Sequence, residues 1–266
     1  HGLFVIFDLH DNGQLKLDQP GQDNSGFRQF WTEVATHFRG KRTHDLAFEL
    51  VNEPVFRDNA EVWFQLQEST VSAIRKIDPE RTIVVSGTSW SGIDTMLKLK
   101  PLAAKNLIYT CHSYDPFQFT HQGATWTGDQ QARLHDIPFP SSPEAVAPVI
   151  PKNDSRDAST IKWYGDQKFD ANYLDGMVKK AVDWGKANNV PVFLGEFGVY
   201  PPTSPKDSRA YWFESMKTAL VKHRLSYCIW GYDDGFGLGR RIDSQGRVQL
   251  DNLTIEHFYK HASNGK

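Results

Sequence analysis

Short apolar runs alternate with longer amphipathic stretches along the whole sequence, and this alternation restricts the fold more than any other feature. Each run is rich in β-branched or aromatic residues on both alternating faces, as is typical of a parallel strand covered on both sides. The runs are Leu3–Leu9, Leu46–Val51, Thr82–Ser86, Leu107–Cys111, Val192–Leu194 and Leu225–Trp230. We therefore predict a sheet of six mainly parallel strands.

The stretches between the runs carry apolar residues at helical spacing. They are centred on Phe27–Phe38, Val62–Ile77, Tyr173–Trp184, Tyr211–Val221 and Leu253–Tyr259. Strands that alternate with helices predict βαβ units, and right-handed crossovers then leave an open doubly wound sheet or a barrel. No Gly-x-Gly-x-x-Gly follows any run, and the glycines of Gly235–Gly239 have the wrong spacing, so we do not expect a dinucleotide site.

One segment, from Asp115 to about Asp170, shows no clear periodicity and contains repeated prolines. Long segments of this kind usually form lids or cleft walls. Its aromatic content argues against a spacer, because it includes Phe117, Phe119, Trp126, Trp163 and Tyr164. We predict a long inserted loop at about 115–170 within a single domain spanning residues 1–266.

Charge and composition exclude several functional classes. The 266 residues include 30 Lys+Arg and 32 Asp+Glu, so there is no basic surplus to neutralise a nucleic acid. No run is long enough to cross a membrane, and two cysteines cannot form a disulfide scaffold or a Cys-rich zinc site. Of the eight tryptophans, four lie on helical stripes and are expected to pack in the core: Trp31, Trp63, Trp184 and Trp212.

The chain begins at His1 with no initiator Met and no charged-then-apolar leader, so no signal peptide is visible. It starts almost directly on an apolar run, and we expect that an N-terminal part has been removed or never existed. Cys111 and Cys228 are predicted to point to opposite faces of strands that are not neighbours, so we do not expect a disulfide between them.

Polar or ring-bearing residues recur at the carboxyl end of every run. They are Asp8 and His10, Asn52 and Glu53, Ser86 with Trp90 just beyond, His112 and Tyr114, Glu196, and Trp230. In (β/α) barrels this end of the strands holds the chemistry. Six such groups at the same end are hard to obtain by chance, and they place a candidate site there.

Two of these residues, Glu53 and Glu196, are carboxylates at the ends of buried strands. Either Glu alone could be a structural, salt-bridged residue. Together they suit glycoside hydrolysis, in which one carboxyl group delivers a proton to the leaving oxygen and the other attacks the anomeric carbon in its ionised form.

The sequence resembles glycoside hydrolase family 5, the cellulase-like family of clan A. The resemblance rests first on Phe48–Pro54 and Phe193–Gly198, which match the family's two catalytic strands. It extends from about residue 2 to about residue 236, with further matches at Leu3–His10, Gly87–Trp90, His112–Tyr114 and Ile229–Trp230. The resemblance implies an α/β fold of the TIM type, as an incomplete (β/α) barrel whose six units match the third to eighth of the family.

The resemblance also implies a retaining mechanism without metal or cofactor. Glu53 corresponds to the acid/base and Glu196 to the nucleophile, and in retaining enzymes the two carboxyl groups lie about 5–5.5 Å apart. Tyr114 is expected to hydrogen-bond Glu196, and His112 to lie between the carboxylates.

The remaining expected site residues contact the sugar chain. Asn52 holds the 2-hydroxyl of the sugar at the cleavage point, and His10 lines the glycone side. Trp230 forms a platform beneath that sugar, and Trp90 and Trp126 are the candidate platforms farther out.

The sequence departs from the family in lacking the first two βα units and the Arg that the family carries near the end of its second strand. The strands at Leu3–Leu9 and Leu225–Trp230 would each lose a neighbour, and exposed apolar edges invite association. Self-association, a separate N-terminal fragment, or closure as a six-stranded barrel would each resolve this. We expect a homo-oligomer that covers the open side.

The leading functional hypothesis is a retaining endo-β-glycanase acting on β-1,4- or mixed-linkage glucan, and hence a secreted or periplasmic protein. The alternative is a catalytically inactive glycan-binding protein on the same scaffold. A metal-dependent hydrolase using His10, Glu53, His112 and Asp233 is weaker, because no strand carries the His-x-His spacing of such sites.

Overall fold

The structure is a computed structural model that describes residues 2–11, 13–19, 21–56, 59–153 and 155–258. Two compact units divide the chain. Unit 1 comprises His1–His112 and Lys180–Phe193, and unit 2 comprises Ser113–Lys179 and Leu194–Lys266. The single domain expected over the whole chain stays a prediction.

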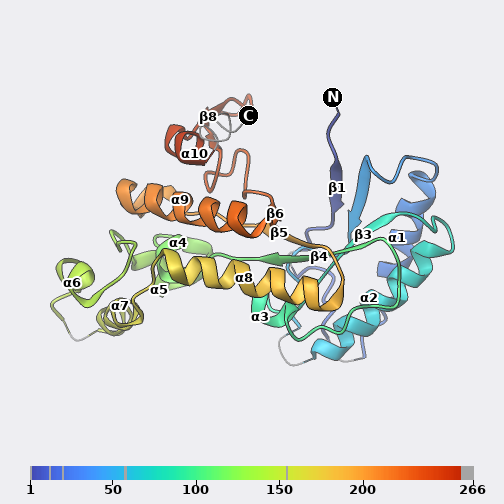
Figure 1. The fold of residues 1–266 in the computed structure, drawn as a ribbon, viewed down its shortest axis with the longest axis horizontal. Helices are drawn as coiled ribbons and strands as arrows, with labels where there is room; N and C mark the ends of the chain where they lie inside the picture. Colours follow the sequence, from blue (N-terminus) through green and yellow to red (C-terminus); the bar gives the residue numbers. More distant parts are fainter. Residues whose placement is uncertain (1, 12, 20, 57–58, 154, 259–266) are drawn as a thin grey trace. The chain divides into compact units, whose positions relative to one another are not determined.

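Six strands form one sheet in the order of the sequence, and the predicted fold class, an incomplete (β/α) barrel, is confirmed (Figure 1). The pairs β1–β2, β2–β3 and β3–β4 are parallel, with Val5 opposite Leu46 and Ala47 opposite Thr82. The strands are β1 (Val5–Asp8), β2 (Leu46–Glu49), β3 (Thr82–Ser86), β4 (Leu107–His112), β5 (Val192–Glu196) and β6 (Ser226–Tyr227).

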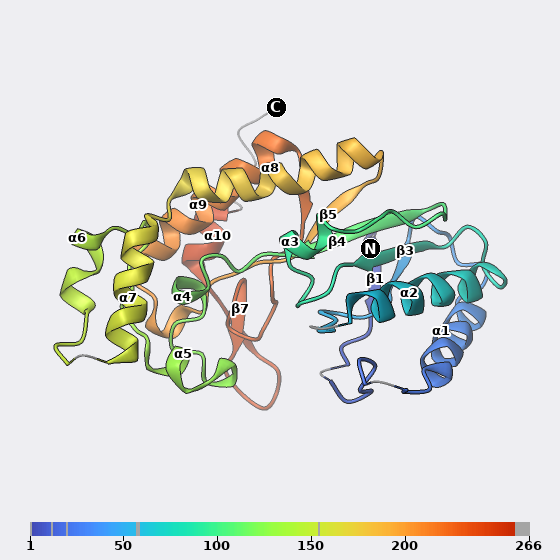
Figure 2. The ribbon, with the colours of Figure 1, turned by 90° about the horizontal axis from the view of Figure 1, so that it is seen from below.

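All five predicted helices are present, and α1 packs against α2 in unit 1 (Figure 2). The helices are α1 (Ser25–His37), α2 (Ala60–Arg75), α8 (Ala171–Asn188), α9 (Lys206–His223) and α10 (Asn252–Phe258). Tyr259, the last residue of the final predicted stripe, lies outside the described residues. None of the helices in the part of the chain that the structure describes could cross a membrane.

The segment at about 115–170, predicted as a long inserted loop, contains several helices and 3-10 turns. The hydroxyls of Ser142 and Ser155 accept the backbone N–H groups of Ala145 and Ala158 at two of the helix starts. The elements are α4 (Phe117–Thr120), η1 (Thr125–Thr127), α5 (Asp129–Arg133), α6 (Pro143–Val146), η2 (Ala147–Val149) and α7 (Arg156–Gln167). All but α7 have only three to five residues, too few to show helical periodicity in a sequence.

Within the described residues, four further elements have no counterpart in the sequence prediction. They are α3 (Ile93–Met96), η3 (Pro201–Thr203) and an antiparallel hairpin of β7 (Gly239–Arg241) and β8 (Val248–Leu250). The hairpin follows β6 and precedes α10.

The expectation that all six strands are covered on both sides is wrong for β1 and β6. β2 is buried throughout, whereas Val5 and Phe7 of β1 are exposed and both residues of β6 are exposed. The run around β6 is apolar in sequence, but only two of its residues have strand geometry. Apolar composition alone therefore did not predict whether the two outer strands of the sheet are buried.

The tryptophans assigned to the core are buried, as predicted. Trp31, Trp63 and Trp212 are fully inaccessible, and Trp184 packs edge-on against Tyr109. A buried indole N–H needs an acceptor. The three inaccessible indoles donate to the backbone carbonyls of Leu50, Ser86 and Asp115 over 2.9–3.1 Å.

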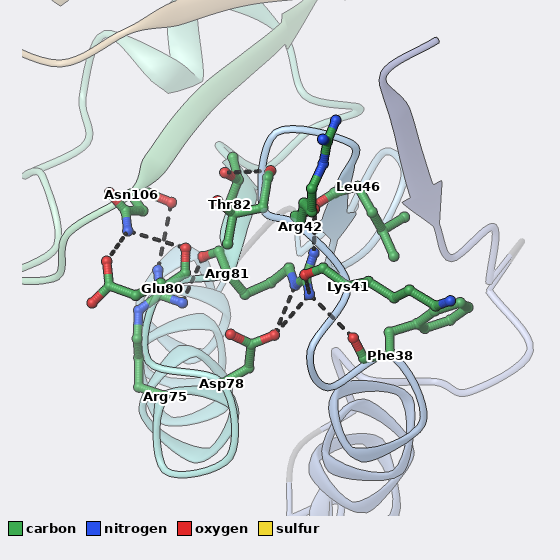
Figure 3. Close-up of polar contacts among 11 residues, drawn as sticks. Phe38, Lys41, Arg42, Leu46, Arg75, Asp78, Glu80, Arg81, Thr82 and Asn106 are labelled. Carbon is green, nitrogen blue, oxygen red and sulfur yellow. Dashed lines mark hydrogen bonds and ion pairs between the residues drawn. The ribbon is translucent and has the colours of Figure 1, made fainter. Parts of the chain in front are cut away.

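A buried arginine joins the amino ends of β2 and β3 (Figure 3). The Arg81 guanidinium is inaccessible to solvent and pairs with the Asp78 carboxylate at 2.8 Å. It also donates to the carbonyls of Lys41 and Leu46 at 2.8 Å and of Phe38 at 3.2 Å. One side chain thereby connects the end of α1, the following loop and β2 to the start of β3.

We predict that Arg81→Met destabilises the protein by about 3–5 kcal/mol, because it leaves Asp78 without its partner and several buried carbonyls without a donor. The matched control is Arg42→Met. Arg42 pairs with Asp45 on the exposed surface, where ion pairs contribute little. Urea unfolding followed by circular dichroism measures both variants, and equal midpoints for the two would contradict the prediction.

Candidate active site

In unit 1, Glu53 follows β2 and is held by a buried histidine. The Nδ1 of His112, the last residue of β4, lies 3.0 Å from the Glu53 Oε1. The His112 side chain is 3% exposed and that of Glu53 is 26% exposed. The backbone N–H of His112 donates to the Ser91 carbonyl at 2.8 Å, which fixes the position of the ring. The geometry gives Glu53 one buried partner and leaves part of its carboxyl group open to a ligand.

Glu53 and three residues of the loop after β3 have left-handed backbone conformations. Glu53 itself has a φ of 51°, and the consecutive residues Ser89, Trp90 and Ser91 have φ values of 52–59°. Non-glycine residues seldom adopt this conformation, and it recurs at functional sites. The loop after β3 is tied to the loop after β2, since the Ser89 N–H donates to the Val55 carbonyl at 2.9 Å.

A cavity of about 680 Å³ lies beside Glu53 in unit 1. Asn52, Glu53 and Trp90 line it, so three of the predicted site residues share one hollow. Trp90 is 45% exposed, which leaves its ring available for contact. The rest of the wall comes from the loop after β1 and the segment after β2: Asp11, Gly13, Lys16, Leu17, Asp18, Gln19, Val51, Pro54, Val55 and Phe56. The loop residues carry no motif, and the sequence analysis did not find them.

His10 lies just beyond β1, where its Nε2 is 2.7 Å from the Asp8 carboxylate. Asn52 is held through its backbone, because its N–H donates to the Leu9 carbonyl at 2.9 Å. The two strand ends therefore stay paired beyond the strands themselves.

In unit 2, Glu196 is the last residue of β5 and is buried. The Tyr114 hydroxyl donates a hydrogen bond of 2.8 Å to the Glu196 Oε2. The backbone N–H of Ser113, next to Tyr114, donates to the Glu196 carbonyl at 3.0 Å. The predicted contact between Tyr114 and Glu196 is therefore present. A hydroxyl donor of this kind stabilises a carboxylate in its ionised form.

Aromatic rings pack around Tyr114, and the sequence analysis missed two of them, His121 and Phe236. The Tyr114 ring lies 4.9 Å from His121 and 5.5 Å from Phe236, centroid to centroid. Burial lowers the pKa of His121 to about 4, so its ring is neutral at the pH of most assays. Rings that meet only through the tertiary fold leave no local signal in a sequence.

Trp126, the candidate outer platform, is 59% exposed and packs edge-on against Tyr200 at 5.0 Å. Trp230 follows β6, and its backbone N–H donates to the Phe197 carbonyl at 3.0 Å. The expected 5–5.5 Å separation of the two carboxyl groups stays a prediction.

Comparison with known proteins identifies the family. Residues 1–235 match the family model described as cellulase, glycosyl hydrolase family 5. The chain belongs to this family. It is 33% identical over 251 residues to Endoglucanase 3 of Fibrobacter succinogenes, covering 90% of this chain and 38% of that protein. It is 27% identical to Endoglucanase C of Acetivibrio thermocellus, covering 87% of this chain and 68% of the relative.

Solved structures share the fold. Endoglucanase Cel5A from Thermotoga maritima matches with a TM-score of 0.75 and 27% identity, over 97% of this chain and 72% of that one. The cellulose synthase subunit Z from Clostridioides difficile matches with a TM-score of 0.77 and 24% identity, over 97% of this chain and 75% of that one. The second likeness shows the fold alone.

We predict that His121 makes stability sensitive to acid. Its pKa of about 4 in the folded protein lies below the ordinary value of about 6.5, so the unfolded chain binds the proton first as the pH falls. The free energy of unfolding should therefore fall as the pH drops from about 6.5 to 4, by roughly 3 kcal/mol at most. His121→Gln should flatten this fall, whereas the exposed control His44→Gln should not. Urea unfolding at pH 7 and 4.5 measures the difference, and an unchanged fall in His121→Gln would contradict it.

Proposed function

We propose that the chain is a retaining endo-β-glycanase that cleaves β-1,4- or mixed-linkage glucan by double displacement. The observation that carries the proposal is the hydrogen bond from the Tyr114 hydroxyl to Glu196, because such a donor favours the ionised form of the carboxyl group that a nucleophile requires. Family membership and the endoglucanase relatives support the reaction and the substrate class.

In the proposed first step, the Glu196 carboxylate attacks the anomeric carbon and the bond to the leaving oxygen breaks. Glu53 gives its proton to that oxygen, and a covalent glycosyl-enzyme remains. In the second step Glu53 takes a proton from water, the water oxygen attacks the same carbon, and Glu196 leaves. The carboxyl oxygen of Glu53 changes protonation state twice per cycle, and the buried His112 ring that contacts it provides a fixed polar partner in both states.

The proposed substrate contacts use residues at the same strand ends. Asn52 would bind the 2-hydroxyl of the sugar at the cleavage point, and His10 the glycone side. Trp230 would stack beneath that sugar, and Trp90 and Trp126 farther along the chain of sugars. The exposure of the Trp90 and Trp126 rings supports this, since a platform must be accessible.

We predict that Glu196→Gln lowers kcat by at least about 1,000-fold while leaving folding and glycan binding largely intact, because an amide cannot attack the anomeric carbon. Glu214→Gln is the matched control, since Glu214 lies on the exposed face of α9. Reducing-sugar release from soluble β-glucan measures turnover, and affinity electrophoresis in the same glucan measures binding.

The stereochemistry of the product tests the mechanism separately. Proton NMR of the first anomer released should show the β form, as double displacement retains configuration. Release of the α form, or wild-type turnover by Glu196→Gln, would contradict the mechanism. Glycan binding without turnover by the unmodified chain would favour the non-catalytic alternative.

We also propose that the protein is secreted or periplasmic, since its proposed substrate is an extracellular polymer.

We propose further that the protein associates through the edge of the sheet formed by β1. Leu3, Phe4 and Val5 are exposed there, and apolar strand edges are prone to pair with other chains. A second copy of the chain is the proposed occupant.

We predict that light scattering of residues 1–266 gives a mass at least twice the 30.3 kDa of one chain, and that Val5→Lys lowers it to one chain mass. A charge on an exposed edge strand opposes pairing without touching the core. Val62→Lys is the matched control, on an exposed valine of α2. A single-chain mass for the unmodified protein would contradict the association. Activity measured on the same fractions shows which species is the enzyme.

A further inference from the structure

Three rings of unit 2 contact one another directly behind the hydroxyl that holds Glu196. Tyr114 lies edge-on to both His121 and Phe236, at interplanar angles of 77° and 81°, and His121 lies 5.0 Å from Phe236. We call Tyr114, His121 and Phe236 the ring cluster. Of its members, Tyr114 donates the hydrogen bond to the proposed nucleophile.

The His121 side of the ring cluster is fixed by hydrogen bonds. The Thr120 hydroxyl donates to the Tyr114 carbonyl, which can only accept, and it lies 3.0 Å from the His121 Nδ1. Because its single hydrogen is used, the hydroxyl oxygen must accept from the imidazole, which places the proton of neutral His121 on Nδ1. The other face of this imidazole stacks on Phe117 at 4.2 Å.

The Phe236 side is fixed by its loop. The backbone N–H of Phe236 donates to the Asp234 carboxylate at 2.9 Å, and the side chain is only 5% exposed. Gly198 allows the ring to approach, because a Cβ there would lie 3.0 Å from the Phe236 Cδ1 and 2.9 Å from the Trp230 carbonyl. Tyr200 packs on the same phenylalanine ring at 5.7 Å.

We propose that Phe236 is a positioning residue that holds the Tyr114 hydroxyl against Glu196. The inference rests on the proposed function and deepens it. A tyrosine side chain can turn about two torsions between several rotamers, and its hydrogen bond weakens steeply as the distance grows or the angle closes. The neutral ring of His121 blocks rotation toward one side and Phe236 blocks it toward another. The loop after β6 therefore controls how well the nucleophile is kept ionised.

The test compares four variants by the pH dependence of kcat/KM on a soluble β-glucan. Tyr114→Phe removes the hydroxyl, so the acidic limb, where the nucleophile gains its proton, should move to higher pH by about one unit. Phe236→Leu should move the acidic limb in the same direction by about half a unit and lower kcat about tenfold. Phe236→Tyr keeps an aromatic ring at this position, so the acidic limb should lie at the same pH as in the unmodified protein. In the Tyr114→Phe background, Phe236→Leu should add no further shift.

The matched control is Phe169→Leu. Phe169 is a buried ring of the same unit that packs on Trp163, Tyr164 and Tyr173, outside the ring cluster. It should lower the melting temperature without moving the acidic limb. Should Phe236→Leu fail to fold, Phe236→Met takes its place in the comparison.

An acidic limb in Phe236→Leu that stays where it lies in Phe169→Leu would overturn the inference. So would a shift that adds fully to that of Tyr114→Phe, because Phe236 would then act without Tyr114. The proposed function fails by a different result, namely turnover by Glu196→Gln, so the two failures are distinguishable.

Discussion

The position of the site in unit 1 depends on the buried guanidinium of Arg81. Its bonds to Asp78 and to the carbonyls of Phe38, Lys41 and Leu46 fix the amino ends of β2 and β3 against each other. Parallel strands rise by about 3.3 Å per residue, so a register set at one end is carried to the other. The carboxyl ends, where Glu53 and the loop of Trp90 emerge, are placed by contacts made a full strand length away.

The two ends of these strands differ in the kind of backbone they contain. The amino ends are satisfied by a dense set of hydrogen bonds, whereas the carboxyl ends contain Glu53 and the three residues Ser89–Ser91 in the left-handed region. Such conformations cost of order 1–3 kcal/mol each and persist only where the surrounding structure holds them. Here the buried pairing of β2 with β3 and the hydrogen bond from Ser89 to Val55 provide that support. Stability is concentrated at one end and the candidate chemistry at the other, as is usual in (β/α) barrels.

The sequence allowed prediction of the parts of the fold that have a period. Short apolar runs identified the strands, and apolar residues at helical spacing identified the long helices. The Glu53–His112 and Tyr114–Glu196 contacts followed from a family resemblance. Short helices such as α4 and α6 have no period to detect. His121 and Phe236 meet Tyr114 across 7 and 122 residues of chain, respectively, and packing between distant residues is decided by the fold. β1 and β6 were assigned to the interior because composition reports apolarity, whereas exposure at a sheet edge depends on which neighbours are present.

The ring cluster also bears on how an uncharged donor stabilises the proposed nucleophile. The family resemblance associates the nucleophile with an Arg near the second strand, and a guanidinium would stabilise the ionised carboxylate by charge as well as by hydrogen bonding. A neutral phenol supplies only the hydrogen bond, whose strength depends on distance and angle. The hydrogen bond from Tyr114 therefore gains more from rigid packing behind the ring than an ion pair would. Because the donor is uncharged and Glu196 is buried, salt screens this stabilisation much less than it would screen an exposed ion pair.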